Sequence, residues 1–127
     1  MNLTDTEFDY LISQAMDELP QKYIKGLDNV VIVYADDPDE HQRLKARLHE
    51  GSLLLGLYEG IPLTSRGAGY TFVLPDKITL FKNPILAVVA THTQLYEQIK
   101  RTLWHEIAHY YGLNHDRIDY LQSNHSS

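Results

Sequence analysis

The chain has 127 residues, 43% of them hydrophobic, which predicts a single domain spanning residues 1–127 with a core of its own. Because it has no cysteine, disulfide bonds and cysteine–zinc sites are excluded, and any metal must be held by histidine and carboxylate side chains. The net charge of −6 would repel a phosphate backbone, so we do not expect nucleic acid as a partner.

The first residues predict a helix. They lack the basic and apolar regions of a signal peptide, and no apolar run in the chain reaches the roughly 18 residues of a membrane span, so we expect a cytoplasmic protein without a membrane partner. Thr4 and Glu7 are spaced as a capping box, and apolar residues follow at helical spacing from Phe8 to Leu19. Pro20 ends this helix or begins another turn.

The middle of the chain predicts strands. The β-branched run at residues 30–34 indicates a buried strand, and the polar segment 39–49 indicates a surface helix. Residues 53–60 indicate a strand that leads into a turn, and residues 70–73 could form another short strand. Residues 77–81 alternate between apolar and polar, as is typical of a half-buried strand.

Two helices are predicted towards the C-terminus. Asn83 is a suitable cap for a helix with Pro84 in its first turn, running to Ala90. A longer helix is predicted from about residues 91–93 to Tyr111, with Gly112 as its C-terminal stop, and a short one over residues 116–121. The order of elements predicts an α+β fold, with a small mixed or antiparallel sheet and helices on one side of it.

The longer helix carries the sequence His-Glu-Ile-Ala-His, from His105 to His109. Two histidines four residues apart lie on one helix face and can reach one metal ion, with Glu106 between them as a general base. Gly112 allows the chain to turn, so that His115 can return as a third ligand and leave a fourth position open for water. The pattern predicts one zinc ion per chain, although other divalent transition metals also suit imidazoles. It further predicts hydrolysis of peptide bonds by a metal-bound water that Glu106 activates.

The motif resembles two groups of metallopeptidases. From His105 to His115 it is similar to the metzincins, but those have a Met-containing turn after the motif, and none of the 12 residues after His115 is Met. A resemblance over nearly the whole chain, in residues 54–63, 74–81 and 101–109, is to a family of small bacterial zincin-like metallopeptidases of unassigned role.

The second resemblance implies a minimal zincin fold, in which a small sheet packs on the active-site helix, and a peptide or protein substrate. By position it makes His105 and His109 metal ligands and Glu106 the base. The family often has a carboxylate where this chain has His115, so that either His115 or Asp116 completes the site.

Other functions stay open at this stage. The spacing of the three histidines also resembles bacterial endoribonucleases that mature ribosomal RNA, but those have glycine in place of Glu106, so Glu106 favours a peptidase. A non-catalytic metal-binding or partner-binding module is a further alternative. One of three segments, residues 53–57, 70–73 or 77–81, could be a sheet edge that pairs with an extended peptide.

Several other polar residues invite a functional interpretation, although structural roles are favoured for them. Tyr58 and Tyr70 could donate to an oxyanion, Arg66 could meet a substrate carboxylate, and Asp119 could orient a ligand imidazole. The acidic residues at 36–40 favour a loop before a helix N-terminus over a cation site. Four further histidines are expected to face solvent: His41, His49, His92 and His125.

Overall fold

The structure is a computed structural model, and it describes residues 2–46, 53–62, 64, 66–67 and 74–113. The elements in chain order are α1 (Asp5–Glu18), α2 (Gln21–Lys25), β1 (Val30–Ala35), α3 (Glu40–Lys45), β2 (Gly56–Glu59), β3 (Asp76–Phe81), α4 (Lys82–Ala87) and α5 (His92–Tyr110). They confirm the predicted α+β fold. The strand predicted over residues 70–73 and the helix over 116–121 lie outside the described residues. None of the described helices is long and apolar enough to cross a membrane.

The sheet is mixed and has the strand order β1-β3-β2 in the described part of the chain. β3 lies in the centre, parallel to β1 and antiparallel to β2. The parallel pairing aligns Val30 with Asp76, and the antiparallel pairing aligns Gly56 with Leu80. β1 and β2 are therefore the edges of the described sheet.

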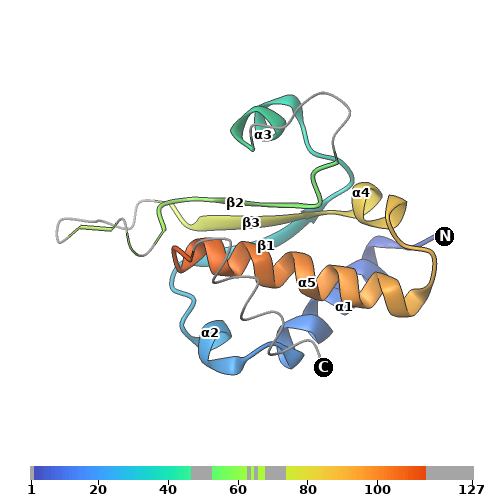
Figure 1. Ribbon diagram of the computed structural model, residues 1–127, viewed down its shortest axis with the longest axis horizontal. Coiled ribbons are helices and arrows are strands. Elements are labelled where there is room, and N and C mark those ends of the chain that lie inside the picture. The colour runs from blue at the N-terminus through green and yellow to red at the C-terminus, as the bar shows by residue number, and fades with distance from the viewer. Residues whose placement is uncertain (1, 47–52, 63, 65, 68–73, 114–127) are drawn as a thin grey trace.

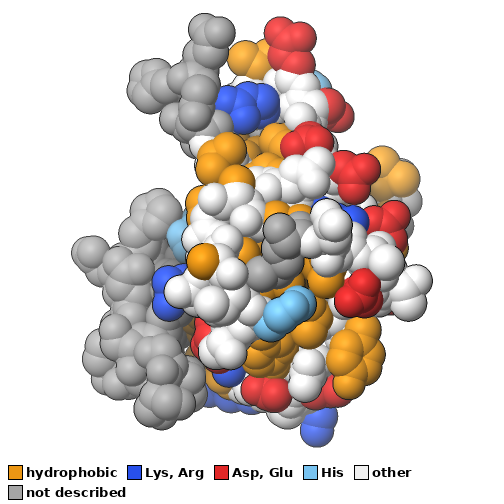
Figure 2. All heavy atoms as spheres, turned by 90° about the vertical axis from the view of Figure 1, so that its right-hand side faces the viewer, with side chains coloured by type: hydrophobic (Ala, Val, Ile, Leu, Met, Phe, Trp, Pro, Cys, Tyr) orange, Lys and Arg blue, Asp and Glu red, His pale blue; other side chains and the backbone are white. Residues whose placement is uncertain are grey.

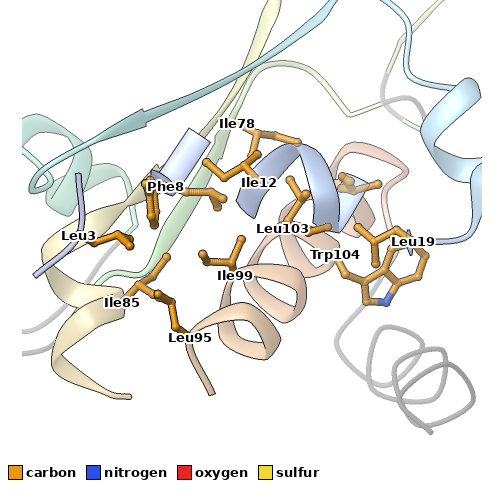
Figure 3. Packing of buried hydrophobic residues seen from close by; sticks show 13 residues of the cluster. Leu3, Phe8, Ile12, Leu19, Ile78, Ile85, Leu95, Ile99, Leu103 and Trp104 are labelled. Carbon is orange, nitrogen blue, oxygen red and sulfur yellow. The ribbon is translucent and has the colours of Figure 1, made fainter. Parts of the chain in front are cut away.

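The core lies between the sheet and the two long helices, α1 and α5 (Figures 1 and 3). α1 contributes Phe8 and Ile12, which Figure 3 shows beside Ile99 and Leu103 of α5. The predicted apolar face of α5 is confirmed, since all five of its members are fully buried: Leu95, Ile99, Leu103, Ile107 and Tyr110. Burying this face fixes the direction in which the remaining side chains of α5 point.

The ends of both long helices match the sequence signals. The Thr4 hydroxyl accepts from the Glu7 N–H at 3.1 Å, and the Glu7 carboxylate accepts from the Thr4 N–H at 3.1 Å, so the capping box is complete. Thr91 caps α5 by accepting from the Gln94 N–H at 3.1 Å. Gly112 follows α5 with φ +76°, a left-handed conformation that glycine adopts without strain.

The prediction that the helices lie on one side of the sheet is wrong for α3, which lies across the opposite face (Figure 1). α3 has no buried residue in its helical span, so it needs little apolar contact with the sheet. Its Lys45 ammonium group lies 2.9 Å from the Glu59 carboxylate of β2, which ties the helix to that face.

Two predictions about strand burial are also wrong. β1 is open on one face, because Val31 and Val33 are 41% and 38% exposed. β3 is buried along nearly its whole length rather than on one face; it is the central strand, with a neighbour on each edge, and α5 packs against it. Alternation of apolar and polar residues predicts that one face of a strand is buried, but it does not predict which strand is central in the sheet.

α4 begins and ends earlier than predicted. Its N-cap is Phe81, so Asn83 lies inside the first turn, where its side-chain amide donates to Asp37 at 2.8 Å. The helix ends at Ala87 instead of continuing to Ala90. Pro84 still occupies the first turn, where its missing N–H costs no helical hydrogen bond.

Candidate metal centre

Three polar side chains gather near the C-terminal end of α5: His105, Glu106 and His109. The Nε2 atoms of the two histidines lie 3.0 Å apart, and one potential ligand atom from each of the three residues lies within 4.8 Å of the others. The histidine side chains are half-buried, while Glu106 is 7% exposed. The predicted convergence of these residues is therefore present in the fold.

The paired imidazoles fit a metal ion. Two nitrogens that each bind a tetrahedral zinc ion at 2.0–2.1 Å are about 3.3 Å apart, close to the separation of the two Nε2 atoms. Imidazole nitrogen is a ligand that zinc prefers, and this chain offers no thiolate in competition. The predicted third ligand, His115, and its alternative, Asp116, lie outside the described residues.

Glu106 is held in place by a hydrogen bond from the sheet. Its Oε1 atom accepts the Tyr58 N–H of β2 at 3.0 Å. Burial raises the pKa of Glu106 to about 7, while the hydrogen bond from the Tyr58 backbone acts in the opposite direction. A carboxyl group with such a pKa exchanges protons readily near neutral pH, as a general base must.

A pocket of about 290 Å³ adjoins Glu106 and His105. It lies between the start of β2 and one face of α5. The residues that line it are Leu54, Leu55 and Gly56 on the strand side and Gln98, Arg101, Thr102, His105 and Glu106 on the helix side. His105 and Glu106 thus border a space that can take part of another molecule.

A buried ion pair supports the strand that holds Glu106. The Asp76 carboxylate of β3 accepts from the Arg66 guanidinium at 2.6 Å and from the Tyr58 hydroxyl at 2.5 Å. The side chains of Arg66 and Asp76 are only 7% and 4% exposed. Burial and the hydrogen bond to Asp76 raise the pKa of the Tyr58 hydroxyl far above its ordinary value, so this hydroxyl keeps its proton.

This network decides two of the open interpretations. The Tyr58 hydroxyl is engaged with Asp76, so the structural role favoured for Tyr58 is confirmed, and its backbone N–H is the group that meets the site. Arg66 likewise has a structural partner in Asp76. Tyr70 and Asp119 lie outside the described residues.

The remaining candidates have the structural roles that were favoured. Asp39 caps α3 by accepting from the Gln42 N–H at 2.7 Å, which confirms a helix start at the acidic segment. His41 and His92 are exposed, as expected. His49 and His125 lie outside the described residues.

Three residues around the site escaped the sequence analysis. No local sequence pattern marks Asp76 as important, because its partners Tyr58 and Arg66 are distant from it in the chain. Arg101 lies four residues before His105, a helical spacing that would have placed it beside the motif. Gly56 lies within an apolar run, and a glycine inside a strand is a known sign of close backbone approach.

Comparisons with known proteins agree with this geometry. The sequence model of the family described as zincin-like metallopeptidase matches residues 27–125. Among solved structures, the fold is similar to that of a conserved hypothetical protein from Thermo thermophilus. That similarity has a TM-score of 0.55 and 24% sequence identity, over 84% of this chain and 92% of the other. The search of curated proteins gave no match.

Proposed function

The chain belongs to the zincin-like metallopeptidase family, and from this premise we propose that it is a zinc-dependent peptidase with Glu106 as its general base. The observation that carries the proposal is the placement of a buried carboxyl group directly beside two converging imidazoles, on the wall of a pocket. A structural zinc site needs the imidazoles but has no need of such a carboxyl group.

His105 and His109 would hold the ion, with His115 or Asp116 as the third protein ligand. When bound, zinc would act as a Lewis acid on the carbonyl of the scissile peptide bond and make a nearby water more acidic. Glu106 takes a proton from the attacking water and delivers it to the leaving amine, so the carboxylate is regenerated in each turnover. The Tyr58 N–H holds Oε1 of Glu106 in place.

The alternative of a metal-dependent ribonuclease receives less support. Glu106 has a clear role in peptide hydrolysis, and the net charge is −6. Figure 2 shows the molecule from the end at which α5 begins, and on that face the basic side chains do not gather into a patch; the C-terminal end of α5, with His105 and His109, lies on the far side of this view. A surface that follows a phosphate backbone needs such a patch.

The proposal is tested by comparing purified wild type, Glu106→Gln and His105→Ala for zinc content and peptide cleavage. Elemental analysis should find one zinc per chain in the wild type and in Glu106→Gln, and a clear loss of zinc in His105→Ala. Mass spectrometry of a diverse peptide mixture should show cleavage by the zinc-loaded wild type only. Removing a general base typically lowers the rate by about 10²–10⁴-fold.

Glu97→Gln is the matched control. Glu97 is exposed on the same helix, nine residues before Glu106 and thus on the opposite helix face. It should retain full zinc content and full cleavage. Cleavage by Glu106→Gln at the wild-type rate would contradict the role of Glu106. If the zinc-loaded wild type cleaves no peptide, the non-catalytic module becomes the better interpretation.

A further inference from the structure

The helix side of the pocket is a continuous stripe along α5. Gln98, Arg101, Thr102, His105 and Glu106 follow one another at intervals of three or four residues or are adjacent, which places them on one helix face. The stripe begins two turns before the candidate metal ligands and ends at them. The pocket therefore extends from the site towards the N-terminal end of α5.

The stripe carries a guanidinium group. Arg101 is the only lysine or arginine among the described residues that line the pocket, and its side chain is exposed. Thr102 is buried, and its hydroxyl accepts from the Gln98 amide at 3.0 Å, so these two side chains of the stripe hold each other in place. A guanidinium group is planar and matches a carboxylate with two parallel hydrogen bonds.

The opposite wall is apolar. Leu54 is buried and Leu55 is half-buried, and the Leu55 carbonyl accepts the Phe81 N–H at 2.9 Å, which ties this wall to β3. An aliphatic stem would lie favourably against these two leucines. The pocket thus combines an apolar wall with a cation, and its volume of about 290 Å³ suits one or two residues of a peptide rather than a large ligand.

We propose that this pocket binds a carboxylate of the substrate through Arg101, so that the protein selects peptides with a carboxylate close to the cleaved bond. The inference rests on the proposed function, since it takes the cleaved bond to lie at His105 and His109. Arg101 precedes His105 by four residues, which is about 6 Å along the helix. An extended peptide advances about 3.3–3.6 Å per residue, so the carboxylate belongs one or two residues from that bond.

Two kinds of carboxylate share this chemistry: an acidic side chain and the C-terminal carboxylate of a peptide. The experiment measures binding to zinc-loaded Glu106→Gln, which retains the site without turnover. Three fluorescent alanine–leucine hexapeptides are compared by anisotropy. The reference peptide has glutamine at its centre and an amidated C-terminus. The second peptide has glutamate at its centre and keeps the amidated C-terminus. The third keeps the central glutamine and has a free C-terminal carboxylate.

We expect at least one of the two carboxylate peptides to bind about fivefold more tightly than the reference, as one partly exposed ion pair allows. The peptide that gains affinity identifies the source of the carboxylate. The gain should be lost when Arg101→Gln is added and should shrink at high ionic strength. Circular dichroism and zinc content establish that the added substitution leaves the fold and the metal site intact.

Lys100→Gln, added in the same background, is the matched control. It removes the same charge from the neighbouring position, but Lys100 pairs with Glu18 of α1 at 3.7 Å, away from the pocket. It should keep the carboxylate gain. Equal affinity for all three peptides, or a gain that survives Arg101→Gln, would overturn the inference. A gain without any cleavage by the wild type would instead overturn the proposed function and leave Arg101 as the carboxylate-binding residue.

Discussion

Gly56 is a residue of the pocket wall at which β2 and α5 approach each other closely. A Cβ atom at this position would lie 2.7 Å from the Thr102 Cγ2 atom and 3.3 Å from the Glu106 Cγ atom. Neither neighbour can move freely, because Thr102 and Glu106 are both buried. Glu106, the proposed general base, can therefore lie this close to β2 because Gly56 has no side chain.

Gly56→Ala should therefore lower the free energy of unfolding by about 1–3 kcal/mol, as inserting a methyl group into a packed interface does. Urea denaturation measures the change. Adding Thr102→Ser, which removes the Cγ2 methyl group, should recover part of the loss. Gly67→Ala is the control, because a Cβ there meets no atom of the described residues within 4 Å, and it should change stability little. Equal losses for Gly56→Ala and Gly67→Ala would contradict the close approach.

The buried Arg66–Asp76 ion pair is the second feature at the residue scale that stabilises the surroundings of Glu106. Asp76→Asn should cost about 3–5 kcal/mol, because it removes the negative charge that Asp76 places beside the buried guanidinium group. Tyr58→Phe removes only one hydrogen bond to Asp76 and should cost about 1 kcal/mol.

Thermal or urea unfolding of both variants is compared with Glu59→Gln. Glu59 pairs with Lys45 and Lys77, whose side chains are 48% and 45% exposed, so this loss should stay below about 1 kcal/mol. If Asp76→Asn lowered the free energy of unfolding no more than Glu59→Gln, the buried pair would not stabilise the fold more than the exposed pairs do.

Among the elements, α1 and α5 could be predicted well because their signals are local. Thr4, Thr91 and Gly112 mark helix ends within a few residues, and the apolar spacing of α5 marks its buried face. The same holds for the His105–His109 pair, whose convergence needs only helical geometry. Local signals also place Glu106 on the helix, but they do not show what holds it.

The strands were predicted less well because their environment is non-local. The centrality of β3 and the open face of β1 depend on which strands pair, and pairing joins residues far apart in the chain. The Tyr58 N–H that binds Glu106 and the Asp76 carboxylate that binds Tyr58 arise from the same pairing. Sequence patterns therefore predicted the convergence of His105, Glu106 and His109, but not the contacts that support Glu106.

The capping box of α1 should make the stability of the fold depend on pH through Glu7. The hydrogen bond from the Thr4 backbone, followed by that from its hydroxyl, lowers the pKa of Glu7 below its ordinary value of 4.5. A carboxyl group with a lowered folded-state pKa stabilises the fold above its unfolded pKa, and that contribution is lost as the pH falls through the folded-state value. Glu7→Gln should therefore be less stable than the wild type at neutral pH.

The difference between these two proteins should shrink as the pH falls below the ordinary pKa of a glutamate, and it should vanish once Glu7 is protonated in the folded state as well. Urea unfolding at a series of pH values measures it. Glu97→Gln, at an exposed position of α5, serves as the control for loss of a negative charge. A difference between wild type and Glu7→Gln that stays constant down to the lowest pH would show that the charge of Glu7 has no part in the cap.

At the scale of the whole molecule, the site joins the helix α5 to the sheet. α5 contributes the three side chains that could hold or serve a metal ion, His105, Glu106 and His109, and Glu106 is hydrogen-bonded to β2. A ligand that binds only the folded chain raises its stability in proportion to the logarithm of the ligand concentration. Metal binding and global stability are therefore coupled.

Zinc at one hundred times its Kd should stabilise the wild type by about 2.7 kcal/mol and raise its Tm. Differential scanning calorimetry with zinc and with excess chelator measures the shift. His105→Ala should lose most of it, while His92→Ala, at an exposed histidine of the same helix, should retain it. A zinc-dependent shift of the same size in His105→Ala would place the bound metal elsewhere.

The hydrogen bond between Tyr58 and Glu106 has a consequence for self-association. β2 is an edge of the described sheet, and an unpaired N–H on a strand edge is a template for pairing with another chain. Glu106 occupies that N–H, so the residue proposed for catalysis also covers part of an edge prone to aggregation. Glutamine at position 106 keeps an acceptor oxygen there, but alanine leaves the amide bare. We expect Glu106→Ala to form oligomers in light scattering under conditions in which Glu106→Gln stays at the wild-type size, which makes glutamine the cleaner probe of catalysis.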